Sequence, residues 1–515
     1  MNKIWVKLFD MDEKKYCYDV GTNNIMRITP PMYDVLSRYN YTNGEEVLKD
    51  LLSEYPEEDI FEAVRKVEEF NKSEGGFILE RRIRLKFPFD EVEYEYLMEN
   101  FLNHLVLNIT EACNLRCHYC SFGGSYKHFR THNKASMSWP VLRKAVDFFC
   151  TRCNLRISEL KKPLFVGFYG GEPLMEHRNM FKAVEYIKEK YPEIFPEIKF
   201  SITSNGTLLT RKIIEKLIRF DFVLSISLNG PEEIQNRNRV FKGGGGTYNT
   251  IMKNIELIKS IDSDYYKKRV LFCATIAPPY NFREMIDFFK GESVNQDNAC
   301  VFNMVDQYDT TYFDGFDMVE ERKKHGEQSL ELVREFIEKK IKGEEDRTLS
   351  AFLKEKYADV HHRRVFKLPE TTYPNGCCLP AIKKLFVDTD GQFHLCEKGS
   401  LDFSYGDIDN GINVKKVFNL IDRYIESTDH CKHCWAIRFC NACFLTSMKG
   451  DRFSIERKRE SCEGIKQRLL NRIKVYISLL ERNPDTFNGS YSKGEDMVEE
   501  LAEFLINRNS SGQKA

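Results

Sequence analysis

The chain has 515 residues, a formal net charge of -1, 42% hydrophobic residues and 30% charged residues. This length allows two or three domains, each with its own core, and the near-zero charge gives no electrostatic reason to expect a nucleic-acid partner. There is no apolar run of about 18 residues and the first residues lack the apolar core of a signal peptide, so we expect a cytoplasmic protein that does not enter the membrane.

Residues 1–95 predict a small α+β module with a winged-helix-like order of strands followed by helices. Alternation of polar and apolar residues indicates the strands, turn residues at 21–24 separate the second from the third, and helical periodicity follows. The expected strands are residues 5–9, 15–20 and 25–28, and the expected helices include residues 32–36 and 60–70.

Residues 100–310 alternate apolar strands with amphipathic helices, which predicts an α/β fold. Six strands are expected, at residues 105–109, 164–169, 198–203, 222–228, 270–276 and 300–305. Their apolar character indicates a parallel sheet, and six units predict a partial (β/α)6 barrel rather than a closed eightfold one. Active sites in such barrels gather at the C-terminal ends of the strands, so we expect functional residues directly after them.

The remainder of the chain divides into three parts by composition. Residues 311–372 are charged and predict a helical bridge, and residues 373–465 form a cysteine-rich region. Residues 466–515 predict a helical C-terminal tail that turns polar and includes one helix at 497–506.

The sixteen cysteines are the most informative residues, because eleven of them fall into three groups at 113–120, 377–396 and 431–462. Disulfides are rare in a reducing cytosol, so clustered cysteines indicate metal binding. Cys150 and Cys153 form a CxxC pair, but a helical pattern surrounds them and no second pair is near. We interpret the five cysteines outside the groups as small buried hydrophobes: Cys17, Cys150, Cys153, Cys273 and Cys300.

The first cysteine group follows the first barrel strand and has the spacing CxxxCxxC: Cys113, Cys117 and Cys120. Three thiolates can hold three irons of a 4Fe-4S cubane and leave the fourth iron open to a small molecule. The motif resembles that of the radical S-adenosylmethionine (radical SAM) superfamily, CxxxCxΦC, with Tyr119 in the aromatic place. The resemblance implies that SAM binds the open iron and is cleaved reductively to a 5′-deoxyadenosyl radical, which takes hydrogen from a C–H bond.

Two further motifs follow the second and third strands. The stretch Gly170-Gly171-Glu172-Pro173 is identical to the GGEP motif of the same superfamily, which implies contact with the amino group of SAM. Glycines also allow a close approach of the backbone. After the third strand, Ser204 and Asn205 supply hydroxyl and amide groups suited to a ribose and a carboxylate.

The fourth strand ends in a stretch that resembles the superfamily motif SxDGPxExHxxxR. The register implies that Ser227 meets the ribose of SAM and that Arg239 meets its carboxylate, a charge-assisted contact. Asn229 stands in place of the usual Asp and Gln235 in place of the usual His, which puts the positioning role of these two side chains in doubt.

The seven ordered cysteines behind the barrel resemble the SPASM domain, which holds two auxiliary 4Fe-4S clusters. The resemblance implies a distal cluster held by Cys431, Cys434, Cys440 and Cys462, and a proximal one held by Cys378, Cys396 and Cys443. Two residues rather than the usual three separate Cys440 from Cys443. A hairpin is expected between Cys378 and Cys396, and Cys377 is the obvious fourth proximal ligand.

Two questions about this cysteine-rich region stay open at the level of sequence. Without Cys377, the proximal cluster has an open iron for a substrate thiolate, and CxxC pairs with further cysteines also fit tetrahedral zinc. Glu397, Asp388 and Asp390 are candidate bases, although solvated loop carboxylates are the simpler interpretation.

The strand-then-helix order of the N-terminal module resembles the RiPP recognition element of enzymes that modify ribosomally made peptides. In that family a leader peptide adds as a strand beside the third strand, where main-chain hydrogen bonds supply the affinity. The alternative is a purely structural appendage.

Together these resemblances imply a radical SAM/SPASM peptide maturase of the sactipeptide or ranthipeptide type, which installs a Cys thioether in a precursor peptide. The expected partners are that precursor and an electron donor such as flavodoxin or ferredoxin, with three 4Fe-4S clusters and SAM as cofactors. Carbon-carbon cross-linking, epimerisation and the formation of formylglycine in a sulfatase are alternative reactions. A zinc or iron-sulfur scaffold without catalysis is the alternative of a different class.

Overall fold

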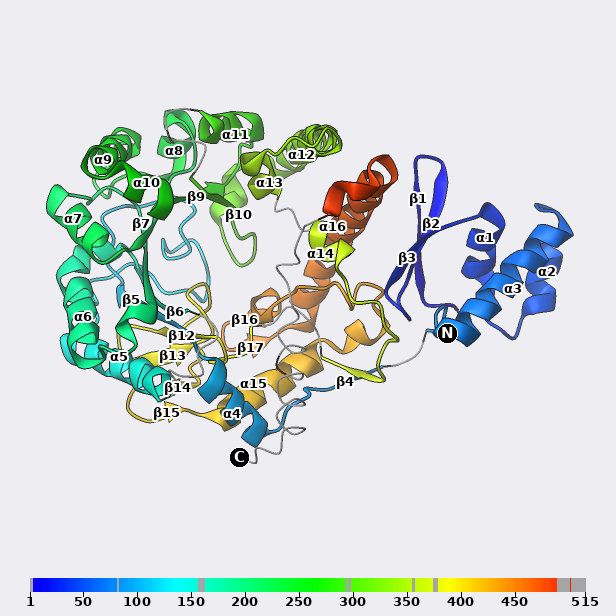
Figure 1. The fold of residues 1–515 in the computed structure, drawn as a ribbon, viewed down its shortest axis with the longest axis horizontal. Coiled ribbons are helices and arrows are strands. Elements are labelled where there is room, and N and C mark those ends of the chain that lie inside the picture. The colour runs from blue at the N-terminus through cyan, green and yellow to red at the C-terminus, as the bar shows by residue number, and fades with distance from the viewer. Residues whose placement is uncertain are drawn as a thin grey trace.

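Figure 1 shows the fold of the chain in a computed structural model. The structure describes residues 3–80, 83–155, 163–291, 294, 298–353, 357–373, 378–488 and 501. Cys377 lies outside the described residues, and of the helix expected at 497–506 only Leu501 is described.

The N-terminal module is a three-stranded antiparallel sheet covered by three helices. The strands β1 (Val6–Met11), β2 (Lys14–Asp19) and β3 (Asn24–Ile28) are followed by α1 (Pro30–Arg38), α2 (Gly44–Leu51) and α3 (Glu57–Glu74), and the sheet order is β1-β2-β3. The Thr29 side chain caps α1 by accepting from the Met32 amide, and Gly75 ends α3 with a positive φ of 68°. Val35, Ile60 and Val67 belong to a core that is separate from that of the barrel.

The barrel consists of six parallel strands with helices outside them, as Figure 1 shows. The strands are β5 (His104–Thr110), β6 (Leu164–Gly170), β7 (Ile198–Ser204), β8 (Val223–Ser227), β9 (Val270–Ile276) and β10 (Cys300–Met304). The helices are α5 (Trp139–Asn154), α6 (His177–Lys190), α7 (Arg211–Arg219), α8 (Glu232–Asn238), α9 (Tyr248–Ile261), α10 (Ser263–Arg269) and α11 (Phe282–Lys290). All six expected strands are present, and the predicted α/β class with a partial barrel is confirmed.

A C-terminal hairpin extends the barrel sheet beyond its first strand. The strand β12 (Lys384–Val387) pairs in parallel with β5, and β13 (Gln392–His394), β14 (Gly406–Asp407) and β15 (Gly411–Ile412) follow it in antiparallel order. The hairpin was expected, whereas its union with the barrel sheet was not. This union places the turn after β12 beside the C-terminal end of β5, from which the first cysteine loop starts.

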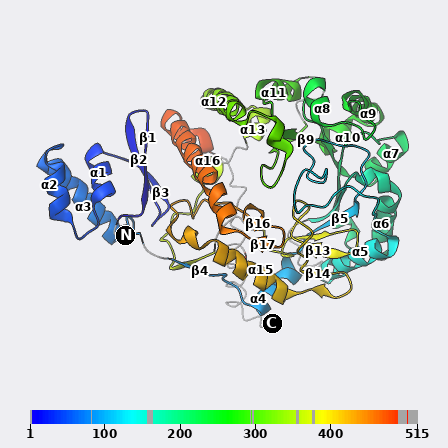
Figure 2. The ribbon, with the colours of Figure 1, turned by 180° about the vertical axis from the view of Figure 1, so that it is seen from behind.

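The remaining elements lie between the N-terminal module and the barrel strands in the chain or follow the barrel. They are β4 (Arg84–Leu85), α4 (Glu91–Phe101), α12 (Met318–Ile341), α13 (Arg347–Leu353), α14 (Tyr357–His361), β11 (Thr371–Thr372), α15 (Val414–Ser427), β16 (Met448–Lys449), β17 (Arg452–Phe453) and α16 (Ile455–Arg482). Figure 2 shows α16 between the N-terminal module and the barrel. Lys14 Nζ donates to the Glu481 carboxylate of α16 at 2.6 Å, and the ring of Tyr18 packs on Trp435 and Phe439. No described helix combines the length and the apolar composition needed to cross a bilayer.

Candidate active site

The first cysteine group occupies the loop that leaves the C-terminal end of β5. The side chains of Cys113, Cys117 and Cys120 are half-buried and lie close enough to influence one another electrostatically. Burial raises the pKa of Cys113 to about 12 and that of Cys120 to about 11, and the neighbouring thiols add to both shifts. A bound metal reverses this effect, because it deprotonates a coordinating thiol outright.

The donor set of this loop suits a cluster. Among the described residues, no three His, Cys, Asp or Glu side chains lie close enough to share one metal ion. A cubane makes no such demand, because each thiolate binds a different iron. Two neighbours bracket the group: His132 Nε2 lies 3.6 Å from Cys120 Sγ, and Asn205 Nδ2 lies 4.0 Å from Cys113 Sγ.

The two glycines at the end of β6, Gly170 and Gly171, are required by the cysteine loop itself. A Cβ atom on Gly170 would lie 2.3 Å from the Thr110 carbonyl oxygen, and one on Gly171 would lie 2.2 Å from that of Ala112. The Gly171 amide donates to Thr110 O at 2.8 Å, so the two loops are joined by main-chain contact. Any side chain at either glycine would therefore push the cysteine loop away from β6.

Glu172 and Ser204 join the ends of β6 and β7. The buried Glu172 carboxylate accepts from Leu174 N at 3.1 Å, from Ser204 Oγ at 2.8 Å and from Asn205 N at 2.7 Å. Burial raises the pKa of this carboxyl, although the three donors and Arg239 oppose the rise. Three donors to Glu172 thus come from within the protein, and they tie the loops after β6 and β7 together.

A closed set of hydrogen bonds surrounds Tyr119 and contains both departures from the superfamily motif. Asn229 Nδ2 donates to the Tyr119 hydroxyl at 2.8 Å, and the Asn229 amide donates to Gln235 Oε1 at 2.9 Å. Gln235 Nε2 donates to Thr247 Oγ1 at 3.0 Å, and this hydroxyl donates to the Arg239 carbonyl at 2.8 Å. Asn229 and Gln235 therefore hold Tyr119 and Arg239 in place, a role that comparison with the motif did not predict.

Arg239 brings a buried cation to the cysteine loop. It is 8% exposed, its Nη1 donates to the Tyr119 hydroxyl at 3.2 Å, and its Nε is buried with no partner. Burial opposes its charge, but Cys117 and Tyr119 raise the pKa of Arg239 overall. An unpaired buried N–H of a cation calls for an anion, which fits a carboxylate of SAM at this point. Ser227 is half-buried and is the last residue of β8, the strand that precedes Arg239 in the chain.

The structure brings together the four cysteines expected to hold the distal cluster. Cys431, Cys434, Cys440 and Cys462 line one pocket together with Lys458 and Lys466. Cys462 Sγ lies 3.4 Å from His430 Nε2. Two ammonium groups suit a cluster with four thiolate ligands, which carries negative charge.

The three cysteines expected at the proximal cluster also neighbour one another. Cys443 is influenced electrostatically by Cys378 and itself influences Cys396, despite the shortened spacing after Cys440. Burial raises the pKa of Cys396 to about 11. Lys384 Nζ pairs with Glu397 Oε2 at 2.8 Å beside Cys396, so this carboxylate is half-buried and ion-paired.

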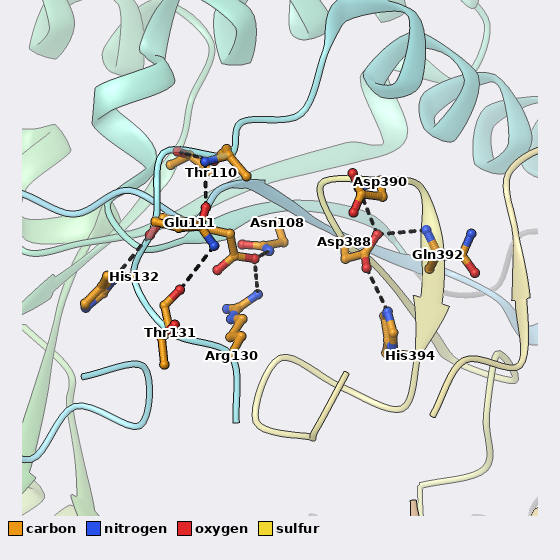
Figure 3. Close-up of polar contacts among 12 residues, drawn as sticks. Asn108, Thr110, Glu111, Arg130, Thr131, His132, Asp388, Asp390, Gln392 and His394 are labelled. Carbon is orange, nitrogen blue, oxygen red and sulfur yellow. Dashed lines mark hydrogen bonds and ion pairs between the residues drawn. The ribbon is translucent and has the colours of Figure 1, made fainter. Parts of the chain in front are cut away.

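Figure 3 shows a group of buried polar side chains between the cysteine loop and the hairpin, of which the sequence analysis named Asp388 but not Glu111, Arg130 or His394. Arg130 Nη1 donates to Glu111 Oε1 at 3.2 Å, and His394 Nε2 lies 2.9 Å from Asp388 Oδ2. Asp388 also accepts from the Gln392 amide at 2.8 Å, so it is a buried turn residue and not a solvated carboxylate. Asp390 is exposed.

Residues 107–290 match a family model described as the Radical SAM superfamily. Over 163 residues the chain is 29% identical to an uncharacterized protein of Methanocaldococcus jannaschii, covering 32% of this chain and 51% of that one. It is 26% identical over 186 residues to a serine-type anaerobic sulfatase-maturating enzyme of Bacteroides thetaiotaomicron, covering 36% and 43%. The chain thus spans about half the length of these curated relatives.

The comparison with solved structures supports the fold. The superposition on the structure titled native anSMEcpe with bound AdoMet covers 73% of this chain and 99% of the anSMEcpe chain, with a TM-score of 0.51 and 19% sequence identity. The same protein with bound AdoMet and the Cp18Cys peptide gives a TM-score of 0.52 at 19% identity.

Proposed function

We propose that the chain, whose residues 107–290 match the Radical SAM superfamily model, is a radical SAM peptide maturase that forms an intramolecular cross-link, a Cys thioether, in a ribosomally made precursor. The proposal includes a cytoplasmic location, two auxiliary 4Fe-4S clusters and an external electron donor such as flavodoxin or ferredoxin. The N-terminal module, over residues 1–95, is proposed to bind the precursor leader.

The observation that carries this proposal is the pairing of β12 with β5. It sets the hairpin that leads to Cys396 beside the strand that leads to Cys113. Because β13 runs back along β12, Cys396 leaves toward the opposite end of β5 from Cys113, but its neighbour Glu397 and Cys120 of the first loop both influence the charge of Tyr169 near the end of β6. A substrate beside Tyr169 would then lie near both cysteine sites. A SAM enzyme that used the first site alone would have no need of the second.

The roles of the residues follow from their positions. Cys113, Cys117 and Cys120 would hold the SAM-binding cluster, and Arg239, steadied by Tyr119 and the Asn229 network, would take the SAM carboxylate. When bound and reduced, this pair of cofactors supplies a 5′-deoxyadenosyl radical, which removes a hydrogen atom from a peptide C–H bond. The surrounding barrel orients the peptide and excludes water.

The leader-binding role rests on an open sheet edge. Within the described residues, β3 pairs with β2 on one side and no strand pairs with its other side. An exposed edge offers unpaired main-chain groups to an extended peptide. The module also contacts the region of the distal cysteines through Tyr18 and Trp435, which connects it to the catalytic part of the chain.

Formylglycine formation is the second candidate, since one relative is named a sulfatase-maturating enzyme and the neighbouring solved structures are titled anSMEcpe. The N-terminal module argues against it, because a leader-binding module has no use in that reaction. Carbon-carbon cross-linking and epimerisation remain within the same class of maturases.

The test requires a candidate precursor, which is sought among short open reading frames next to the gene. The reduced protein, reconstituted without oxygen, is incubated with SAM and this peptide, and tandem mass spectrometry locates the change. A thioether removes two hydrogen atoms from the peptide and blocks alkylation of one cysteine. No mass change but a change in chirality would support epimerisation, and conversion of a sulfatase peptide alone would overturn the maturase assignment.

Replacing Arg239 by glutamine tests the SAM contact. We expect SAM to bind roughly 10 to 100 times more weakly, because a charge-assisted hydrogen bond contributes about 1.5–3 kcal/mol. Equilibrium dialysis with labelled SAM measures the effect, and iron content should not change. Arg269→Gln is the matched control, since Arg269 pairs with Asp221 away from the site. Equal affinity of the Arg239→Gln variant and the unaltered protein would refute the contact.

A further inference from the structure

Arg130 is a buried arginine at the barrel mouth that none of the motifs explains. Its side chain is 5% exposed, and its guanidinium carbon lies 4.0 Å from the centre of the Phe122 ring and 5.8 Å from that of Phe386. Phe122 follows the cysteine loop and Phe386 belongs to β12. Arg130 is thus held between the barrel and the C-terminal hairpin.

Most of the hydrogen-bonding capacity of this guanidinium is unused. Nη1 donates to Glu111 Oε1 at 3.2 Å, while Nε and Nη2 are both buried without a partner. A buried donor that is left unpaired destabilises a protein, and the effect is larger for a charged group. Among the arginines in the described part of the chain, it is the one with two such nitrogens.

The two unpaired nitrogens lie on the same edge of the guanidinium plane. Their N–H bonds point in parallel directions, and this fork matches the two oxygens of a carboxylate. Arg269 shows the match within this protein, because its Nε and Nη2 each donate to one oxygen of Asp221 at 2.6 Å. The free edge of Arg130 therefore has the geometry of a carboxylate receptor.

The neighbouring carboxylates do not fill this edge. In the part of the chain that the structure describes, Glu111 Oε1 accepts from Asn108 Nδ2 and from Arg130 Nη1. Asp388 influences Arg130 electrostatically, but its oxygens accept from His394 and from the Asp390 and Gln392 amides. Figure 3 shows Arg130 next to the Glu111 carboxylate, with Asp388 to one side on the hairpin.

Other neighbours place the free edge near the site of reaction. Cys120 of the cysteine loop and Tyr169 at the end of β6 are both close enough to influence the charge of Arg130. A group that binds to Arg130 would lie beside the first cysteine loop and the hairpin at once. This is where a peptide must lie if both cysteine sites act on it.

We propose that the Nε–Nη2 edge of Arg130 binds a carboxylate of the peptide substrate, and so fixes which residue of the peptide faces the radical. The proposal rests on the proposed function. The carboxylate comes either from an Asp or Glu side chain or from the C-terminus of the peptide, and the two sources share the same chemistry.

The experiment is an affinity selection with the full-length protein, reconstituted without oxygen and loaded with SAM. Two pools of short random peptides are used, one with a free C-terminal carboxylate and one with a C-terminal carboxamide. The unaltered protein, Arg130→Gln and the control Arg269→Gln are compared. All three contain the same N-terminal module, so peptides that this module retains are found with each of them and do not contribute to the difference. Arg269 is a suitable control because Asp221 already occupies its fork.

We expect the unaltered protein and the control to retain acidic peptides about tenfold over neutral ones, as one charge-assisted contact allows, and Arg130→Gln to lose the preference. A preference for Asp or Glu in both pools assigns the side chain, and a preference for the free-carboxylate pool assigns the C-terminus. Absence of any preference in the unaltered protein, or its persistence in Arg130→Gln, would overturn the proposal.

Two further measurements keep the result interpretable. Arg130→Gln leaves the buried Glu111 without its cation, so the charge-neutral double variant Glu111→Gln/Arg130→Gln is tested alongside, with iron content as the check on folding. SAM cleavage without peptide is measured separately. If the protein retained acidic peptides but did not cleave SAM, the proposed function alone would be refuted. If it cleaved SAM but showed no preference for acidic peptides, the Arg130 proposal alone would be refuted.

Discussion

Replacing Cys117 by alanine is expected to reduce SAM cleavage to the level seen without protein. Cys117 is the middle ligand of the proposed SAM-binding cluster, and Arg239 lies close to it. Loss of an outer partner of a metal ligand already costs about 10–100-fold in affinity or activity, so loss of a ligand itself should exceed about 100-fold. The measurement is the release of 5′-deoxyadenosine by the dithionite-reduced protein, followed by liquid chromatography.

The control for this variant is Cys150→Ala. Cys150 is fully buried in α5 and packs in the main core, so the substitution removes a thiol without touching the cysteine loop. We expect a small loss of stability and unchanged SAM cleavage. If Cys117→Ala still turned over SAM at a measurable rate, the assignment of the first cysteine group would be wrong.

The fold and the cysteine groups could be predicted because their signals are local. Each barrel strand is a short apolar run, and the three cysteine groups lie within stretches of 8, 20 and 32 residues, at 113–120, 377–396 and 431–462. The parallel pairing of β12 with β5 has no such signal, since Lys384 and His104 are far apart in the chain and a register between distant strands leaves no mark in either. The hairpin was therefore expected, but not its place.

The contacts of the polar residues Arg130, Asn229 and Gln235 could not be predicted for the same reason. Arg130 lies in a polar loop that reads as solvated, and its burial depends on Phe386 from the distant hairpin. Asn229 and Gln235 read as losses from a motif, whereas in the fold they complete hydrogen bonds to Tyr119 and Thr247. The burial and the hydrogen-bond partners of a polar group depend on residues that are distant in the chain. Comparing one residue at a time with a motif therefore cannot predict them.

Replacing Cys434 by alanine is expected to abolish the formation of modified precursor while SAM cleavage continues. Cys434 lines the pocket with the other three distal cysteines, and these lie on a different part of the chain from the SAM site. Losing one of four ligands should remove roughly four irons per chain while most SAM cleavage remains, because distant sites act independently to a good approximation. Iron analysis, electron paramagnetic resonance and 5′-deoxyadenosine release measure these effects, and modified precursor should no longer form.

The matched control is Cys153→Ala, whose thiol is buried in α5 and should leave both iron content and turnover unchanged. A Cys434→Ala protein that kept its full iron content would show that this cysteine is not a ligand. One that lost SAM cleavage altogether would show that the distal site supports the fold of the barrel or feeds electrons to it. Trp435 follows Cys434 and packs on Tyr18 of the N-terminal module. The variant should therefore also weaken the contact between this module and the cysteine-rich region, which a lower melting temperature would reveal.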